Sequence, residues 1–225
     1  MKMLTNSPID KLLDGGLEKD AITNIYGPPG TGKTNIALSA TLACLKDKKV
    51  AYVDTEGSFS LERFKQMGGT EKDLKNIIMV HVHDWKEQHK KIMELEKIIE
   101  KEKDVGLVVV DSLVALYRLE MDEKNFSLVN KQLATQYSIF SKITRTKNIP
   151  ILVTNQVYSK GDEIEITSRQ VARYWSKTLV ELRRLEKDNQ RIAILRKHRS
   201  LAEGRSIEFE ITEKGLKETK VFGVF

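Results

Sequence analysis

The stretch Gly27-Pro-Pro-Gly-Thr-Gly-Lys-Thr34 is rich in glycine and has the spacing of a phosphate-binding loop, or P-loop. Such a loop aims several backbone N–H groups at one anion. Glycine allows this because it reaches φ values that a Cβ atom excludes. We expect the loop and the residue after it to hold the phosphates of a nucleotide, through Gly27, Pro28, Pro29, Gly30, Thr31, Gly32, Lys33, Thr34 and Asn35.

Two residues at the end of the loop have side chains suited to phosphate chemistry. Lys33 stands at the start of the next helix, where the helix dipole already favours an anion, and its ammonium group can bridge β- and γ-phosphate oxygens. Thr34 can offer its hydroxyl to Mg²⁺. An apolar strand over residues 21–26 enters the loop and a helix over residues 35–45 leaves it. This context favours ATP and Mg²⁺ as ligands over a glycine-rich loop that binds nothing.

Length and composition predict one α/β domain over residues 1–225, with two small domains as the alternative. The 225 residues are 40% hydrophobic, which is enough for one substantial core. The chain starts without an apolar signal segment, and no apolar run is long enough to cross a bilayer, so we expect a soluble cytoplasmic protein with no membrane partner. The single cysteine, Cys44, lies among apolar residues, which favours a buried and inert thiol.

The apolar pattern predicts that strands and helices alternate. Strands are expected over residues 49–53, 77–82, 107–111 and 150–154, with helices over 61–67, 84–102 and 126–143 between them. Helices between successive strands imply a parallel sheet. From residue 178 the pattern changes to hairpins, with strands expected over 178–185, 191–196 and 206–211. The sequence therefore predicts an α/β fold with a mainly parallel twisted sheet, flanking helices and a C-terminal antiparallel extension.

Two carboxylates at predicted strand ends are candidates for catalysis. Asp111 ends the apolar strand over residues 107–111, a position from which it can hold Mg²⁺ beside Thr34. Many NTPases activate water with a Glu directly after this Asp, but here the next residue is Ser112. Glu56 is the expected substitute because strand ends on one sheet edge converge over the P-loop. The alternative for Glu56 is a solvated carboxylate in a turn.

The positive charge of the chain is regional. The net charge is +6, yet eleven Lys or Arg residues face only four Asp or Glu residues between Arg169 and Arg205. This excess of about seven positive charges is what a polyanion-binding surface would need. The alternative is a set of ordinary strands with solvated basic faces.

Five segments together resemble the RecA/RadA recombinases in their order and spacing. They span nearly the whole chain and are Ile9-Asp-Lys-Leu-Leu-Asp-Gly-Gly-Leu17, the P-loop, Tyr52-Val-Asp-Thr-Glu-Gly-Ser-Phe59, Leu107-Val-Val-Val-Asp-Ser112 and Leu152-Val-Thr-Asn-Gln156. The resemblance implies a RecA-like P-loop ATPase core. It also implies that Glu56 is the catalytic base and that Gln156 senses the γ-phosphate and communicates with a DNA-binding loop. By the same resemblance Arg63 packs on adenine. The alternative for Gln156 is a residue that only caps an element, and the alternative for Arg63 is an ordinary surface arginine.

The chain also departs from the strand-exchange members of this family. Those proteins carry an N-terminal helix-hairpin-helix domain, which we expect to be absent here, and a Phe-x-x-Ala segment that docks into the next subunit. None of the seven phenylalanines has an alanine three residues later, so filament formation by that route is in doubt. The two loops that line DNA in the family correspond to residues 118–125 and 158–173, which are rich in acidic residues here.

Acidic loops repel phosphate, so we expect DNA contacts elsewhere. The candidates are basic residues near the end of the second loop and in the following strands: Arg169, Arg173, Arg196, Lys197, His198 and Arg199. Tyr174 or Trp175 could stack on bases, although a bulky aromatic residue more often belongs to the core.

Three functions fit these residues. The first is an ATP-binding protein that assists homologous recombination and DNA repair, binds single-stranded DNA and recombinase or other repair proteins, and hydrolyses ATP weakly or conditionally. The second is a full DNA-dependent ATPase and strand-exchange recombinase, which would form filaments. The third is a signalling ATPase similar to KaiC, with no role on DNA. The sequence leaves self-association open.

Overall fold

The computed structural model describes residues 2–160 and 163–222. Within these ranges the chain forms a nine-stranded sheet in the order β13-β12-β11-β10-β3-β7-β6-β4-β5. The strands from β10 to β5 in this order are parallel. Their bounds are β3 Ile22–Tyr26, β4 Lys49–Asp54, β5 Ile77–His81, β6 Val105–Asp111, β7 Ile151–Asn155 and β10 Thr178–Arg184.

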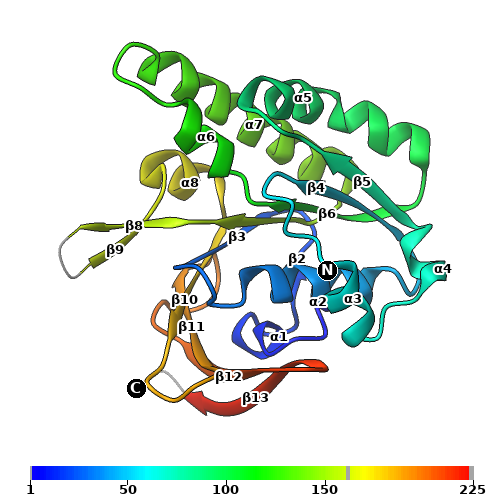
Figure 1. Cartoon of the computed structure of the whole chain (residues 1–225), viewed down its shortest axis with the longest axis vertical. Helices are drawn as coiled ribbons and strands as arrows, with labels where there is room; N and C mark the ends of the chain where they lie inside the picture. Colours follow the sequence, from blue (N-terminus) through cyan, green and yellow to red (C-terminus); the bar gives the residue numbers. More distant parts are fainter. Residues whose placement is uncertain (1, 161–162, 223–225) are drawn as a thin grey trace.

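The helices cover both faces of the sheet (Figure 1). The upper layer in that view consists of α5 Trp85–Glu102, α6 Ala115–Glu120 and α7 Phe126–Lys147. The opposite layer contains α1 Ile9–Leu12, α2 Lys33–Cys44 and α3 Leu61–Gln66, and α4 Glu71–Leu74 follows α3. Each layer has its own apolar cluster against the sheet, because a parallel strand is buried on both faces. None of the helices in the described ranges combines the length and apolar character of a membrane span.

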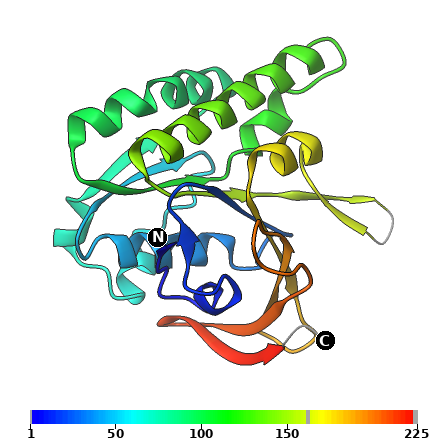
Figure 2. The same ribbon diagram turned by 180° about the vertical axis from the view of Figure 1, so that it is seen from behind.

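The C-terminal strands extend the sheet as expected. Strands β11 Gln190–Lys197, β12 Ser206–Thr212 and β13 Gly215–Phe222 pair antiparallel, beginning on β10. They curl beneath α1 and α2, so that the far end of the sheet lies under the helix that follows the P-loop (Figure 2). The predicted fold class, a mainly parallel sheet with a C-terminal antiparallel extension, is confirmed.

Several elements had no expectation in the sequence. They are the helices α1, α4, α6 and α8 Arg169–Trp175, the strand β13, the short pair β1 Lys2–Met3 and β2 Leu17–Glu18, and the hairpin β8 Val157–Lys160 and β9 Glu163–Ile166. Both β9 and α8 fall in a segment that the sequence presented as an acidic loop followed by basic residues. Their apolar residues are too few to show a period, so pairing and packing partners decide their structure.

Cys44 ends α2 in the apolar layer beneath the sheet. The residue is 6% exposed, and burial raises the pKa of its thiol to about 12. An unreactive thiol follows, as the sequence indicated, because the thiolate is the nucleophilic form.

Tyr137 of α7 connects the upper layer to two neighbouring strands. It is completely buried, and its hydroxyl accepts hydrogen bonds from the side-chain amides of Asn24 at 2.9 Å and Asn155 at 3.4 Å. Burial raises the pKa of the Tyr137 hydroxyl above its ordinary value. A polar contact inside an apolar layer is costly to break, since the partners are left without water.

Replacing Tyr137 by Phe is therefore expected to lower the free energy of unfolding by about 1–3 kcal/mol, because two buried amides lose their acceptor. Urea unfolding followed by circular dichroism measures this. Tyr174→Phe is the matched control, since Tyr174 is 74% exposed and its hydroxyl can remain in water. Equal stability of the two variants would contradict the assignment.

Candidate functional site: a phosphate loop at the carboxyl edge of the sheet

The P-loop connects the end of β3 to the start of α2. Gly30 and Gly32 have φ angles of +73° and +98°, in the left-handed region that favours glycine. Gly32 also precedes the first turn of α2, so the free N–H groups of the helix start open into the loop. This is the conformation that the glycine spacing predicted.

The side chain of Lys33 reaches back across the P-loop. Its ammonium group donates to the carbonyl oxygens of Gly27 at 2.8 Å and Pro28 at 3.0 Å. Burial lowers the pKa of Lys33, and the carboxylates of Asp111 and Glu56 act in the opposite direction. The three side chains that the sequence assigned to one site therefore lie within electrostatic range of one another.

The C-terminal extension forms the outer wall of the loop. A Cβ atom added to Gly27 would lie 2.4 Å from the carbonyl oxygen of Leu182 in β10. A Cβ atom at Gly30 would lie 2.2 Å from Nη2 of Arg184, and one at Gly32 would lie 3.2 Å from Cδ1 of Ile211. Glycine is thus needed for the close approach to backbone at Gly27 and for the backbone angle at Gly30, where the flexible end of the Arg184 side chain could move aside.

Asp111 ends β6 beside Asp54, its partner in the register of β4. Asp111 is 3% exposed, and hydroxyl groups satisfy its carboxylate: Tyr52 and Ser58 both donate to Oδ2 at 3.0 Å, and Thr154 donates to Oδ1. Burial, then the nearby Asp111 charge, raises the pKa of the Tyr52 hydroxyl. A buried carboxylate is stable here because each of its oxygens accepts a hydrogen bond.

Asp54 shapes the loop that carries Glu56. Its carboxylate accepts hydrogen bonds from the backbone N–H groups of Glu56 at 3.3 Å, Ser58 at 3.0 Å and Phe59 at 3.2 Å. The chain after β4 therefore turns around one buried side chain. This turn directs Glu56 toward Ser112, the residue after Asp111.

Glu56 belongs to a chain of side-chain hydrogen bonds. Its Oε1 accepts from the hydroxyl of Ser112 and from Nε2 of Gln156, the latter at 3.0 Å. The side-chain carbonyl oxygen of Gln156 accepts from Nη1 of Arg118 at 2.9 Å. Glu56 and Gln156 are thus brought together as the sequence indicated, whereas Ser112 and Arg118 were not assigned to the site.

Arg63 lies on α3 with the edge of its guanidinium group fixed. Its Nε donates to Oδ1 of Asn35 at 2.7 Å, its Nη2 to the carbonyl of Thr212 at 2.8 Å and its Nη1 to the carbonyl of Glu213 at 2.7 Å. These contacts use the N–H edge of the guanidinium group, which leaves stacking on its faces compatible with them. Arg63 also joins α2 to the turn between β12 and β13.

The basic segment over residues 196–199 is largely engaged by protein groups. Arg196 pairs with Glu181 at 2.7 Å. Arg199 pairs with Glu18 at 2.9 Å and with Asp20, and these contacts raise its pKa. The His198 side chain is 1% exposed, and burial lowers its pKa. DNA contact by these residues stays a prediction, and the charges of both arginines are compensated within the chain.

A second group of cations surrounds the end of α8. Arg173, Tyr174 and Lys177 are exposed, and Lys197 donates to the carbonyl oxygens of Arg173 and Ser176, the latter at 2.9 Å. Burial, with Lys177 and Arg173 close by, lowers the pKa of Lys197. The rings of Tyr174 and Trp175 meet edge to face at 5.3 Å. The side chain of Arg169, another predicted DNA contact, lies outside the described residues.

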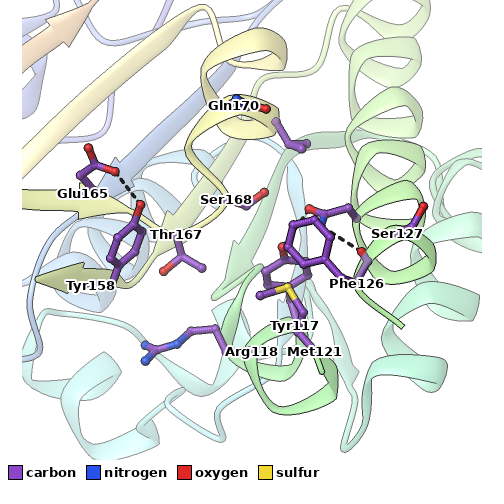
Figure 3. Close-up of a pocket in the computed structure, with 12 residues that line it drawn as sticks. Tyr117, Arg118, Met121, Phe126, Ser127, Tyr158, Glu165, Thr167, Ser168 and Gln170 are labelled. Carbon is purple, nitrogen blue, oxygen red and sulfur yellow. Dashed lines mark hydrogen bonds between the residues drawn. The ribbon is translucent and has the colours of Figure 1, made fainter. Parts of the chain in front are cut away.

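A cavity of about 950 Å³ lies between α6, α7, α8 and the β8–β9 hairpin (Figure 3). Its lining includes Tyr117, Phe126, Tyr158 and Gln170, together with Arg118, the residue that donates to Gln156. The cavity thus separates the two segments that correspond to the DNA-lining loops of the family. A chain of three hydrogen bonds connects its wall to Ser112 beside Asp111.

Among the described residues, no cluster of three His, Cys, Asp or Glu side chains could hold a metal ion. A hard cation at Thr34 and Asp111 would therefore need phosphate oxygens or water as further ligands, which is the usual coordination of Mg²⁺.

Comparison with known proteins gives the family. The family model described as Rad51 matches residues 1–219, and the chain belongs to that family. Within it, the chain is similar to proteins named DNA repair and recombination protein RadB. It is 42% identical to that of Methanobrevibacter smithii over 224 residues, which cover 96% of this chain and 95% of the relative. It is 38% identical to that of Methanocaldococcus jannaschii over 218 residues, which cover 93% of this chain and 98% of the relative.

A solved structure of the RadB recombinase has the same fold. It is 36% identical in sequence and superposes with a TM-score of 0.83, covering 97% of this chain and 100% of that chain. The RecA-like core that the sequence implied is confirmed, and this type of core binds nucleotides.

The role of Asp54 can be tested by Asp54→Ala, which leaves three backbone N–H groups without their charged acceptor. We expect the free energy of unfolding to fall by about 2 kcal/mol or more, since hydrogen bonds to a charged group contribute about 1.5–3 kcal/mol each. Hydrogen exchange should also accelerate at residues 56–59. The control is Asp47→Ala, which removes an exposed carboxylate of the same charge; if the two variants unfold alike, Asp54 does not support the loop.

Proposed function

We propose that the protein binds ATP with Mg²⁺ and assists homologous recombination and DNA repair. The observation that carries the proposal is the P-loop itself: Gly30 and Gly32 have positive φ angles, and Lys33 at the start of α2 reaches back across the loop to the carbonyl oxygens of Gly27 and Pro28. The names of its relatives, DNA repair and recombination proteins, support the biological role.

The residues present suit ATP and Mg²⁺. The P-loop and the start of α2 would hold the phosphates through backbone N–H groups, with Lys33 at the β- and γ-oxygens. Thr34 and Asp111 would hold Mg²⁺, the latter through water, and the ion would neutralise charge on the phosphates. The faces of Arg63 would stack on adenine.

The contacts of Glu56 support weak or conditional hydrolysis. A general base must reach the attacking water. Ser112 and Gln156 both hold Oε1 of Glu56, while Arg118 at the cavity wall holds Gln156. Occupation of the cavity or the arrival of a γ-phosphate would change the partners of Gln156, and through it the orientation of Glu56. Hydrolysis would then depend on what is bound.

Single-stranded DNA is the proposed polyanion. Arg173, Lys177 and Lys197 offer cations beside Tyr174, a residue that is 74% exposed. This combination of cations with a stacking surface suits a flexible strand without sequence preference. Gln170 of the same helix faces the cavity, so a strand on α8 would lie close to the wall that contacts Gln156.

The two other functions make different predictions. A strand-exchange recombinase would hydrolyse ATP rapidly with DNA and form filaments, whereas a signalling ATPase would not bind DNA. Phosphate release with and without single-stranded DNA, beside a gel-shift measurement, separates all three. The proposed protein partners are recombinase or other repair proteins. Whether the protein associates with itself can be measured by sedimentation.

Two variants should separate nucleotide binding from turnover. Lys33→Ala is expected to remove most ATP affinity, because it deletes the mobile cation at the phosphates.

The variant Glu56→Gln should bind ATP normally but hydrolyse it about 10² to 10⁴ times more slowly, the usual effect of losing a general base. Isothermal titration and phosphate release measure the two effects. Normal ATP affinity in the lysine variant would reject the phosphate site.

The proposed DNA surface can be tested by comparing substitutions in it with a substitution of Arg199, whose charge is paired with carboxylates. Replacing Arg173 and Lys177 by Ala should reduce the slope of log K against log salt for single-stranded DNA by about 1.4, or about 0.7 for each lost phosphate contact. Arg199→Ala should change the slope little, since two carboxylates already pair with that guanidinium. Fluorescence anisotropy with two unrelated oligonucleotides measures this. A larger effect of Arg199→Ala would move the DNA surface to residues 196–199.

A further inference from the structure

Two arginines of neighbouring strands near the C-terminal end of the sheet contact the P-loop from outside. Arg184 in β10 and Arg191 in β11 are register partners, so their side chains leave the same face of the antiparallel pair. Nη2 of Arg184 donates to the carbonyl oxygen of Pro29 at 2.8 Å, and Nε of Arg191 donates to that of Gly30 at 3.0 Å. We propose that both are positioning residues that orient the phosphate-binding N–H groups of the loop. The proposal rests on the proposed binding of ATP.

The peptide geometry explains how these contacts act. In a trans peptide the C=O and N–H groups point in opposite directions. An arginine on the Pro29 carbonyl therefore fixes the direction of the Gly30 N–H, and one on the Gly30 carbonyl fixes the direction of the Thr31 N–H. Both carbonyls are held outward, which turns both N–H groups toward the inner side of the loop. Glycine at residue 30 is flexible by itself, so an external restraint has a large effect there.

The charges of the pair argue that the arrangement is more than surface packing. Like charges directly opposite in a sheet are unfavourable. Within the described part of the chain, no carboxylate lies close enough to either guanidinium to form an ion pair, in contrast to Arg196 and Arg199. Burial, then the neighbouring Arg184, lowers the pKa of Arg191, and the carboxylate of Asp188 acts in the opposite direction. The carbonyl dipoles of the loop offset this repulsion in part, and a phosphate anion on the other side of the loop would offset more of it.

The positioning role predicts which nucleotides are affected. The N–H groups of a P-loop cradle the α- and β-phosphates. Loss of their orientation should therefore weaken ADP and ATP equally. An arginine that instead reached the γ-phosphate directly would affect ATP more than ADP.

The test compares Arg184→Ala, Arg191→Ala and the double variant with Arg183→Ala. Arg183 is the matched control because it lies next to Arg184 and carries the same charge. It pairs with Glu181, and in the Arg183→Ala variant Glu181 would still pair with Arg196. We expect each of the first two substitutions to weaken ADP and ATP binding about tenfold, in line with one hydrogen bond from a charged donor, and the control to stay within about twofold. Isothermal titration gives the affinities.

A second measurement does not need the nucleotide. In ¹⁵N spectra of the free protein, Arg184→Ala should shift the Gly30 amide signal and Arg191→Ala that of Thr31, while Arg183→Ala leaves both in place. The thermal midpoints of the free variants should match the wild type. Unchanged signals, affinities no weaker than those of the control, or a greater loss for ATP than for ADP would each overturn the proposal. A wild type that binds no nucleotide would overturn the proposed function instead, and the spectra would still decide whether the arginines orient the loop.

Discussion

Strand β10 runs so close to the P-loop that a methyl group at residue 27 would lie 2.4 Å from the carbonyl oxygen of Leu182. The rest of the site depends on this approach. Because β10 pairs with β3 in parallel, the strand that carries the loop also fixes the position of its outer wall. The antiparallel strands then bring Arg191 and Ile211 against the same loop. The C-terminal strands are therefore part of the proposed nucleotide site, although they follow the P-loop by about 150 residues.

The inner wall of the site is a cluster of buried polar groups. Two carboxylates, Asp54 and Asp111, are register neighbours at the carboxyl edge of the sheet, where their mutual repulsion would be costly without partners. Backbone N–H groups satisfy Asp54 and hydroxyl groups satisfy Asp111. The ammonium group of Lys33 supplies the nearby positive charge. The contacts of the two carboxylates differ: Asp54 accepts from the backbone of the loop that follows it, whereas Asp111 is the residue proposed to hold Mg²⁺.

Sequence patterns predicted the parts of the fold and site that depend on local rules. The glycine spacing predicted the P-loop, and the end of an apolar strand predicted the position of Asp111. The contacts of Ser112, Arg118 and Arg184 could not be predicted, because they depend on which strands are neighbours and on side-chain direction. The contacts of the basic segment over residues 196–199 could not be predicted from the sequence for the same reason. Arg196 and Lys197 are adjacent in sequence, but neighbouring residues of a strand point to opposite faces, so one reaches Glu181 and the other reaches α8.

The position of Glu56 shows why a missing residue in a familiar pattern need not mean a missing function. Many NTPases place the base directly after the Asp at the strand end, and here Ser112 has that position. Ser112 donates to Oε1 of Glu56, so the neighbouring strand supplies the carboxylate and Ser112 orients it. Gln156 donates to the same oxygen. A carboxylate held from two sides on one oxygen is fixed in direction, and the reach of this proposed base toward a nucleotide would then depend on Gln156 and on Arg118 behind it. Control of turnover from the cavity would follow from this geometry without movement of the P-loop itself.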